Sequence, residues 1–158
     1  MTLADQIQTS LTAAMRSQDA LRRDTLRMVT AAAYNAEKAA RRPLTDDEYL
    51  TVLTREVKTR RESVEAYEQG GRQDLAARER AEIAIIAEFL PQPLTDVELQ
   101  AMVAAAVDET GASSARDLGR VMAVLTPRTR GRADGKVVSG LVAQELATRD
   151  LASHEHAG

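Results

Sequence analysis

Apolar side chains recur at every third or fourth position along most of this chain, and proline or glycine interrupts the pattern at intervals. This spacing places apolar residues on one face of an α-helix, which must then pack against another element. We therefore expect an all-α fold. The uninterrupted stretches predict seven helices, at about residues 3–17, 19–40, 46–69 and 73–90, then one ending at Gly111, one ending at Pro127 and one following Asp134.

The amino-acid composition agrees with helices rather than strands. Hydrophobic residues make up 44% of the chain, so a core can form, but Phe89 is the single phenylalanine beside three tyrosines and no tryptophan. Sheets favour aromatic and β-branched residues, whereas abundant alanine and leucine suit helices packed through small side chains. The expected core is therefore aliphatic.

Helix starts and stops are marked by capping residues. Thr45 and Glu48, and again Thr95 and Glu98, have the spacing of a capping box, in which a hydroxyl and a carboxylate each satisfy a free backbone amide. Gly70-Gly71 and Gly111 are expected to end helices, because glycine tolerates the left-handed conformation there. Ser113 or Ser114 is expected to cap the sixth helix, and Asp134 the seventh.

The segment from Pro91 to Pro93 is stiff and extended, and it predicts a boundary between two helical lobes. Residues 1–90 are expected to form an N-terminal bundle of about four helices. Residues 94–147 are expected to form a small unit of three helices. The polar tail at residues 148–158 is expected to be disordered.

Several classes of protein are disfavoured by what the sequence lacks. No stretch approaches the roughly 20 apolar residues of a membrane span. The N-terminal residues do not resemble a signal peptide, and no cysteine is present to form a disulfide. A cytoplasmic protein without a membrane partner is the expectation.

Catalytic machinery is not evident. Nucleophilic catalysis needs a base beside the nucleophile, and the two histidines, His154 and His156, both lie near the C-terminal end. Two imidazoles make an incomplete metal site. Neither of the glycine-rich phosphate-binding motifs, GxxxxGK(S/T) and GxGxxG, is present in the sequence. Glu56 and Arg60, four residues apart, are typical of an ordinary surface pair. We expect no catalytic residue, metal ion or cofactor in the chain.

The most unusual segment runs from Thr126 to Lys136 and leads into a helix N-terminus, which attracts phosphate through free amides and its dipole. Glycines within it allow close approach of the backbone. It is our candidate RNA-binding site, with these residues: Arg128, Arg130, Gly131, Arg132, Gly135 and Lys136.

A simpler interpretation of the same segment remains open, because it is also consistent with a solvated loop in which Asp134 only caps the helix and competes with an anion. A second basic region, Arg22–Arg42, holds six cations against two acids. The chain as a whole carries a net charge of −3 and few aromatic residues for stacking on bases. Any RNA partner is therefore expected to be recognised as a folded shape, through phosphate and sugar contacts.

Eight segments of the chain form a recognisable set of motifs: Leu26–Met28, Val52–Lys58, Arg60–Ser63, Gly71–Leu75, Glu79–Ile83, Leu90–Leu94, Gly111–Met122 and Gly131–Lys136. Together these motifs resemble the YqeY-like family, over about residues 2–146. The domain of that family is shared with the C-terminal tail of the GatB subunit of glutamyl/aspartyl-tRNA amidotransferase.

This resemblance implies an N-terminal helical bundle, a C-terminal three-helix unit and a link to tRNA. In the amidotransferase this domain contacts the outer corner of the tRNA, while the kinase and amidase sites lie elsewhere. The family is often labelled as a carbon–nitrogen ligase with glutamine as amido donor, but this chain lacks the catalytic part. The expected function is a tRNA-binding accessory module. The alternative is a protein–protein docking module for an amidotransferase or an aminoacyl-tRNA synthetase.

Overall fold

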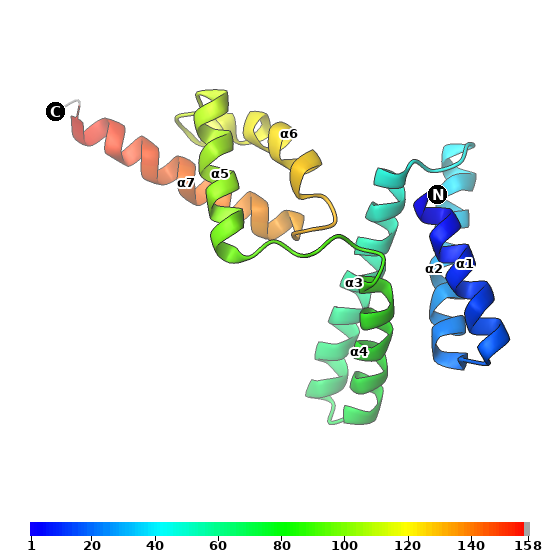
Figure 1. Ribbon diagram of the computed structural model, residues 1–158. Coiled ribbons are helices and arrows are strands. Elements are labelled where there is room, and N and C mark those ends of the chain that lie inside the picture. The colour runs from blue at the N-terminus through cyan, green and yellow to red at the C-terminus, as the bar shows by residue number, and fades with distance from the viewer. Residues whose placement is uncertain (157–158) are drawn as a thin grey trace. The chain divides into compact units, whose positions relative to one another are not determined.

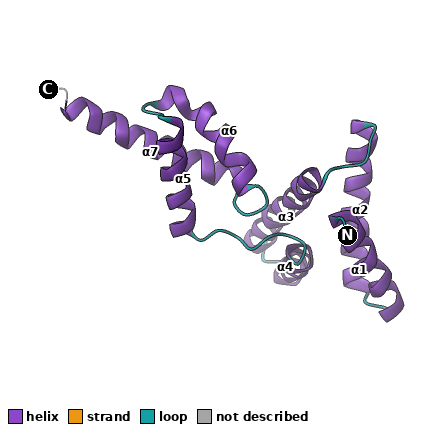
Figure 2. Ribbon diagram, turned by 45° about the horizontal axis from the view of Figure 1, so that its top comes forward, coloured by secondary structure: helices purple, strands orange, loops and turns teal. Residues whose placement is uncertain are grey.

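A computed structural model describes residues 1–156, and within them every regular element is helical, as predicted (Figures 1 and 2). A short 3-10 helix, η1, precedes α6. The elements are α1 (Leu3–Ser17), α2 (Ala20–Ala40), α3 (Asp46–Gln69), α4 (Gln73–Ala87), α5 (Asp96–Thr110), η1 (Ala115–Asp117), α6 (Leu118–Thr129) and α7 (Gly135–His156).

The chain divides into two compact units, Met1–Pro91 and a second unit beginning at Gln92. In the first unit, α1 and α2 form one helical hairpin, and α3 and α4 form another (Figure 1). Aliphatic side chains from all four helices make one core. Its fully buried members include Ile7, Leu26, Leu53 and Ile86.

The second unit has a separate core formed by α5, α6 and α7. Each helix contributes aliphatic residues at three-to-four spacing, such as Val103 with Val107 on α5 and Val138 with Val142 on α7. Its largest fully buried side chains are Leu125 and Leu146. Because each unit buries its own apolar faces, each has the basic requirement for folding by itself.

Capping follows the sequence pattern closely. Reciprocal capping boxes are present at Thr45 with Glu48 and at Thr95 with Glu98. Gly111 ends α5 in the left-handed conformation, with a φ of 67°. Ser114 forms a capping box with Asp117, but it begins η1, and α6 starts only after that turn.

Two predicted helix ends are wrong. Helix α4 ends at Ala87 rather than Leu90, because residues 88–90 bond to carbonyls three residues back and form a tighter turn. Helix α6 continues past Pro127 to Thr129. Proline removes only its own N–H, and the last turn is closed by the Arg130 amide, which donates to the Thr126 carbonyl at 3.0 Å.

The expectation of a disordered tail at residues 148–158 is also wrong for its described part. Helix α7 continues to His156, and its last turns extend beyond α5 and α6 in Figure 1. Arg149 stabilises this extension, since its guanidinium is paired with Glu145 one turn earlier and with Asp108 on α5. Residues 157–158 lie outside the described residues.

The interior of the first unit contains an ion pair that the sequence did not indicate. Arg60 on α3 is only 6% exposed, and its Nε donates to Glu82 on α4, which is equally buried, at 3.0 Å. Arg60 also donates to the Glu56 carboxylate at 2.7 Å. The prediction of an ordinary surface pair between Glu56 and Arg60 is therefore wrong.

No helix among residues 1–156 combines the length and the apolar character needed to cross a membrane.

Candidate nucleic-acid interface

The basic segment between α6 and α7 is a compact turn rather than an extended loop. The carbonyl of Thr129 accepts hydrogen bonds from the amides of Arg132, at 2.9 Å, and Ala133, at 3.1 Å. Gly131 lies within this turn, between Thr129 and Arg132, and adopts the left-handed backbone conformation with a φ of 75°. Glycine is favoured at such a position because it has no Cβ. Thr129 is itself buried and bonds to the Leu125 carbonyl, so the turn is fixed to the core of the second unit.

Two of the predicted RNA-binding arginines are engaged by the second unit itself. Arg128 lies in the last turn of α6, and its guanidinium donates to both carboxylate oxygens of Glu109 on α5, at 2.9 and 3.0 Å. The hydrogen bond from Arg128 lowers the pKa of the Glu109 carboxyl. Arg132 donates through Nε to the Gln92 carbonyl at 3.0 Å. The Arg132 carbonyl in turn accepts from the Leu94 amide at 2.9 Å.

The remaining predicted residues lie near the start of α7. Arg130 is half-buried, whereas Gly135 and Lys136 are exposed at the first two positions of the helix. Asp134 caps α7 as expected, because its carboxylate accepts from the Lys136 amide at 2.9 Å. One amide of this helix N-terminus is therefore already occupied. The Lys136 side chain forms no ion pair among residues 1–156.

Much of the positive charge in the second basic region is also balanced locally. Arg22 donates to the Ser10 hydroxyl from both Nε and Nη2 and pairs with Glu88. Arg42 makes a two-pronged pair with Glu48, at 2.7 and 2.8 Å. These arginines link neighbouring segments of the first unit and are poorly placed to bind a ligand.

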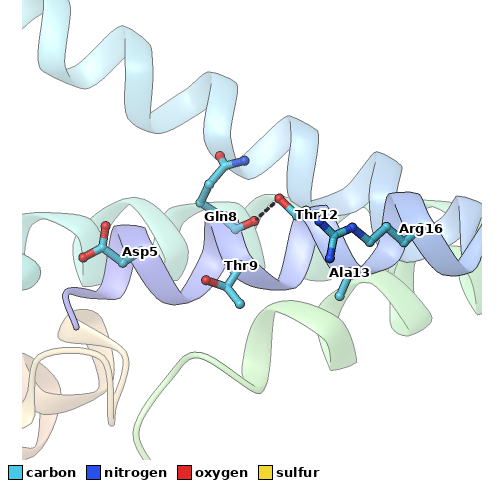
Figure 3. A pocket seen from close by; sticks show the side chains of 6 residues that line it. All are labelled: Asp5, Gln8, Thr9, Thr12, Ala13 and Arg16. Carbon is cyan, nitrogen blue, oxygen red and sulfur yellow. Dashed lines mark hydrogen bonds between the residues drawn. The ribbon is translucent and has the colours of Figure 1, made fainter.

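A surface hollow along α1 does not resemble a ligand site. All the side chains that line it come from α1, as Figure 3 shows, so no second element encloses a ligand. One hydroxyl in it is already used within the helix, since Thr12 donates to the Gln8 carbonyl at 3.0 Å. The lining residues are Asp5, Gln8, Thr9, Thr12, Ala13 and Arg16.

Metal-binding groups are likewise not clustered. Among residues 1–156, no three histidine, cysteine or carboxylate side chains gather where they could hold an ion.

The chain is similar to known proteins along most of its length. A family model described as Yqey-like protein matches residues 4–146. A protein of the fungus Pyrenophora tritici-repentis, named altered inheritance of mitochondria protein 41, mitochondrial, is 27% identical over 148 residues. That alignment covers 90% of this chain and 80% of the fungal protein. The matched range includes the turn at Gly131 and the start of α7.

Proposed function

This chain belongs to the Yqey-like protein family, and on that premise we propose that it is a tRNA-binding accessory module without catalysis of its own. The contact would be the segment from Arg128 to Lys136, which we name the α6–α7 turn. It would bind the phosphate backbone of a folded RNA.

The observation that carries this proposal is the left-handed turn at Gly131. An extended strand would place Arg130, Arg132 and Lys136 on one face but spread them over about 20 Å, at about 3.3 Å per residue. A compact turn instead keeps Arg130, Arg132 and Lys136 within a few residues of one helix N-terminus, where phosphate is favoured. The backbone bond from the Leu94 amide to the Arg132 carbonyl, at 2.9 Å, holds this turn in place before any ligand arrives, and it is kept when the Arg132 side chain is replaced. Preorganisation of this kind lowers the entropy cost of binding.

The proposed mode of binding is insensitive to base sequence. Arginine and lysine contacts to phosphate fix position and orientation, whereas base contacts specify sequence. The few aromatic side chains offer little stacking surface, with one phenylalanine and three tyrosines in the chain. A folded RNA presents closely spaced phosphates to such a turn without any base being read.

The test is tRNA affinity measured against salt concentration. Replacing Arg130, Arg132 and Lys136 with glutamine should weaken binding and lower the salt slope by roughly 0.7–0.9 for each phosphate that the variant no longer neutralises. Two tRNAs of unrelated sequence should be affected alike. Circular dichroism should show unchanged helicity, because none of the three side chains is in the core.

A matched control removes the same charge elsewhere. Arg55, Lys58 and Arg61 are exposed on α3 in the first unit, and their replacement with glutamine should leave the salt slope close to that of the original protein. Equally weakened binding in both triple variants would mean that only the total charge matters. An unchanged slope in the first variant would place the RNA contact elsewhere and contradict the proposal.

The family label of carbon–nitrogen ligase is proposed to describe the assembly to which related domains belong, and not this chain alone. Several of the described carboxylates pair with arginines, as Glu82 does with Arg60 and Glu109 with Arg128. We expect the purified protein to release no ammonia from glutamine, with or without ATP. Ammonia release above that of a heat-inactivated sample would contradict this proposal.

A further inference from the structure

The outer face of α2 carries an exposed stripe that the RNA proposal does not use. Its residues are separated alternately by four and three positions, which places them along one side of the helix. We name this surface the α2 stripe. Its members, all exposed, are Arg27, Ala31, Tyr34, Lys38 and, directly after the helix end, Arg41.

The positive charge of the α2 stripe is not neutralised by an ion pair. No carboxylate among residues 1–156 lies within ion-pair distance of Arg27, Lys38 or Arg41. Asp24 accepts a hydrogen bond from Arg23 at 2.8 Å and interacts with Arg27 only at longer range, and Glu37 accepts from the Leu44 amide at 3.4 Å. The α2 stripe thus differs from the rest of this basic region, where Arg22 and Arg42 are paired.

An exposed aromatic residue lies at the middle of the stripe. Tyr34 is 60% exposed, and the Lys38 ammonium lies 5.5 Å from the centroid of its ring. The preceding member, Ala31, is small enough to let a neighbouring backbone approach closely. Tyrosine and arginine are enriched at the centres of protein interfaces, where they supply much of the binding free energy.

We propose that the α2 stripe docks an acidic amphipathic helix of a protein partner. The alternation of four and three places the five side chains in one row along the helix, with Ala31 and Tyr34 near its centre and cations at both ends. From Arg27 to Arg41 the stripe is about 21 Å long, which is about the length of two heptads of a second helix. Carboxylates of the partner would pair with Arg27, Lys38 and Arg41, and an apolar residue would cover Tyr34.

A protein helix explains this surface better than RNA does. Bases bind exposed tyrosines by stacking on the ring, and the Lys38 ammonium already lies over the Tyr34 ring. A helix contacts the ring through aliphatic side chains while its carboxylates attract the lysine away from the ring. The inference does not depend on the RNA proposal, because α2 belongs to the first unit and the α6–α7 turn to the second.

The experiment uses the full chain and two synthetic helical peptides of about three heptads, so that the stripe is covered along its whole length. One has leucine and glutamate at the seam positions, and the other has lysine in place of each glutamate. Binding is followed by fluorescence anisotropy and by amide chemical shifts. The acidic peptide should bind and shift the amides of α2, with affinity falling as salt rises, and the basic peptide should not bind.

Variants locate the contact. Replacing Arg27, Lys38 and Arg41 with glutamine should weaken binding of the acidic peptide by on the order of tenfold or more. Tyr34→Ala should weaken it without changing its dependence on salt. The control that replaces Arg55, Lys58 and Arg61 removes equal charge from α3 and should leave the affinity within about a factor of two.

Three results would overturn the proposal. The first is no binding of the acidic peptide, or equally weakened binding in the two triple variants. The second is that an RNA hairpin changes the amide chemical shifts of α2 whereas the acidic peptide does not, which would show that the α2 stripe binds nucleic acid. The third is self-association in analytical ultracentrifugation that the α2 variant abolishes, which would assign the stripe to a second copy of the chain.

Discussion

At the scale of single residues, Arg60 is the side chain with the largest expected influence on stability. It is buried with Glu82, and its partners come from both helices of the α3–α4 hairpin. A buried ion pair is not strongly stabilising by itself, because desolvation offsets the attraction, but removing one partner leaves a buried charge uncompensated. Arg60→Leu should therefore destabilise the protein by about 3–5 kcal/mol in a denaturant titration.

Glu82→Leu should cost less than Arg60→Leu, because Arg60 would keep Glu56 at 2.7 Å. After Arg60→Leu, by contrast, the one cation within ion-pair distance of Glu82 among residues 1–156 would be the exposed Arg78, at 3.6 Å. The double replacement should recover most of the stability, since both buried charges are then absent. Strictly additive destabilisation in the double variant would contradict this account.

The importance of Arg60 could not be predicted from its sequence neighbours. Glutamate followed four residues later by arginine is a common surface pattern, and Glu56 does occupy that position. The decisive partner is Glu82, 22 residues further along. Only the pairing of α3 with α4 buries the two side chains together, and no local pattern gives the rotation of each helix about its axis.

At the scale of helices, the N-terminus of α3 is expected to respond to acid. The hydrogen bond from Arg42, together with the Thr45 amide, lowers the pKa of Glu48 from 4.5 to about 2. A carboxyl group whose pKa is lowered by folding stabilises the folded protein at pH values above the pKa that the group has in the unfolded chain. That contribution is fully present above about pH 4.5 and disappears as the pH falls toward about 2.

Removing Arg42 tests this directly. In Arg42→Gln, the pKa of Glu48 measured by NMR titration should rise toward 4.5, because the hydrogen bond that lowers it most has been removed. The difference in stability between the original protein and the variant should shrink as the pH falls from about 4.5 to about 2. An unchanged Glu48 titration would mean that the Arg42 pair does not persist in solution.

Helix starts were more predictable than helix ends. Capping at Thr45 and Thr95 is local, so a few residues of sequence suffice to identify it. The prediction that Pro127 ends α6 is wrong, because this proline removes only its own backbone N–H donor from the last turn of the helix. The extension of α7 past Ala147 is stabilised by the contact of Arg149 with Asp108, which lies 41 residues earlier in the chain.

At the scale of the whole molecule, the family and the all-α class could be predicted from the sequence. Which cations of the basic segment are already bonded to other residues could not. The sequence identified the cations between Arg128 and Lys136 and the glycines among them. It could not indicate that Arg128 pairs with Glu109, 19 residues earlier, or that Arg132 bonds to Gln92, 40 residues earlier. Tertiary packing decides which cations of a basic segment remain available to a ligand.

The two separate cores predict that residues 92–156 fold without the first unit. Their core draws on α5, α6 and α7 alone, so the fragment should show a helical circular-dichroism spectrum and a cooperative thermal transition. A fragment of this size is marginally stable, and small changes in stability should be visible. A random-coil spectrum at low temperature would show that this unit needs residues 1–91.

A shorter fragment, residues 92–147, tests the described tail. It lacks Arg149 and with it the pairs to Glu145 and Asp108. Asp108 is 69% exposed at its side chain, so solvent screens that pair, and the shorter fragment should be less stable by no more than about 1 kcal/mol. For a domain of this size, 1 kcal/mol lowers the melting temperature by roughly 4–8 °C.

The contribution of the ion pairs can be separated from that of the helix itself. Arg149→Gln in the longer fragment should reproduce most of the shift in melting temperature, because it removes both pairs and keeps the last turns of α7. Thr148→Ala provides the control, since its exposed hydroxyl bonds only to the Gln144 carbonyl within α7. Equal melting temperatures for the two fragments would mean that the last turns of α7 add nothing to the stability of the second unit.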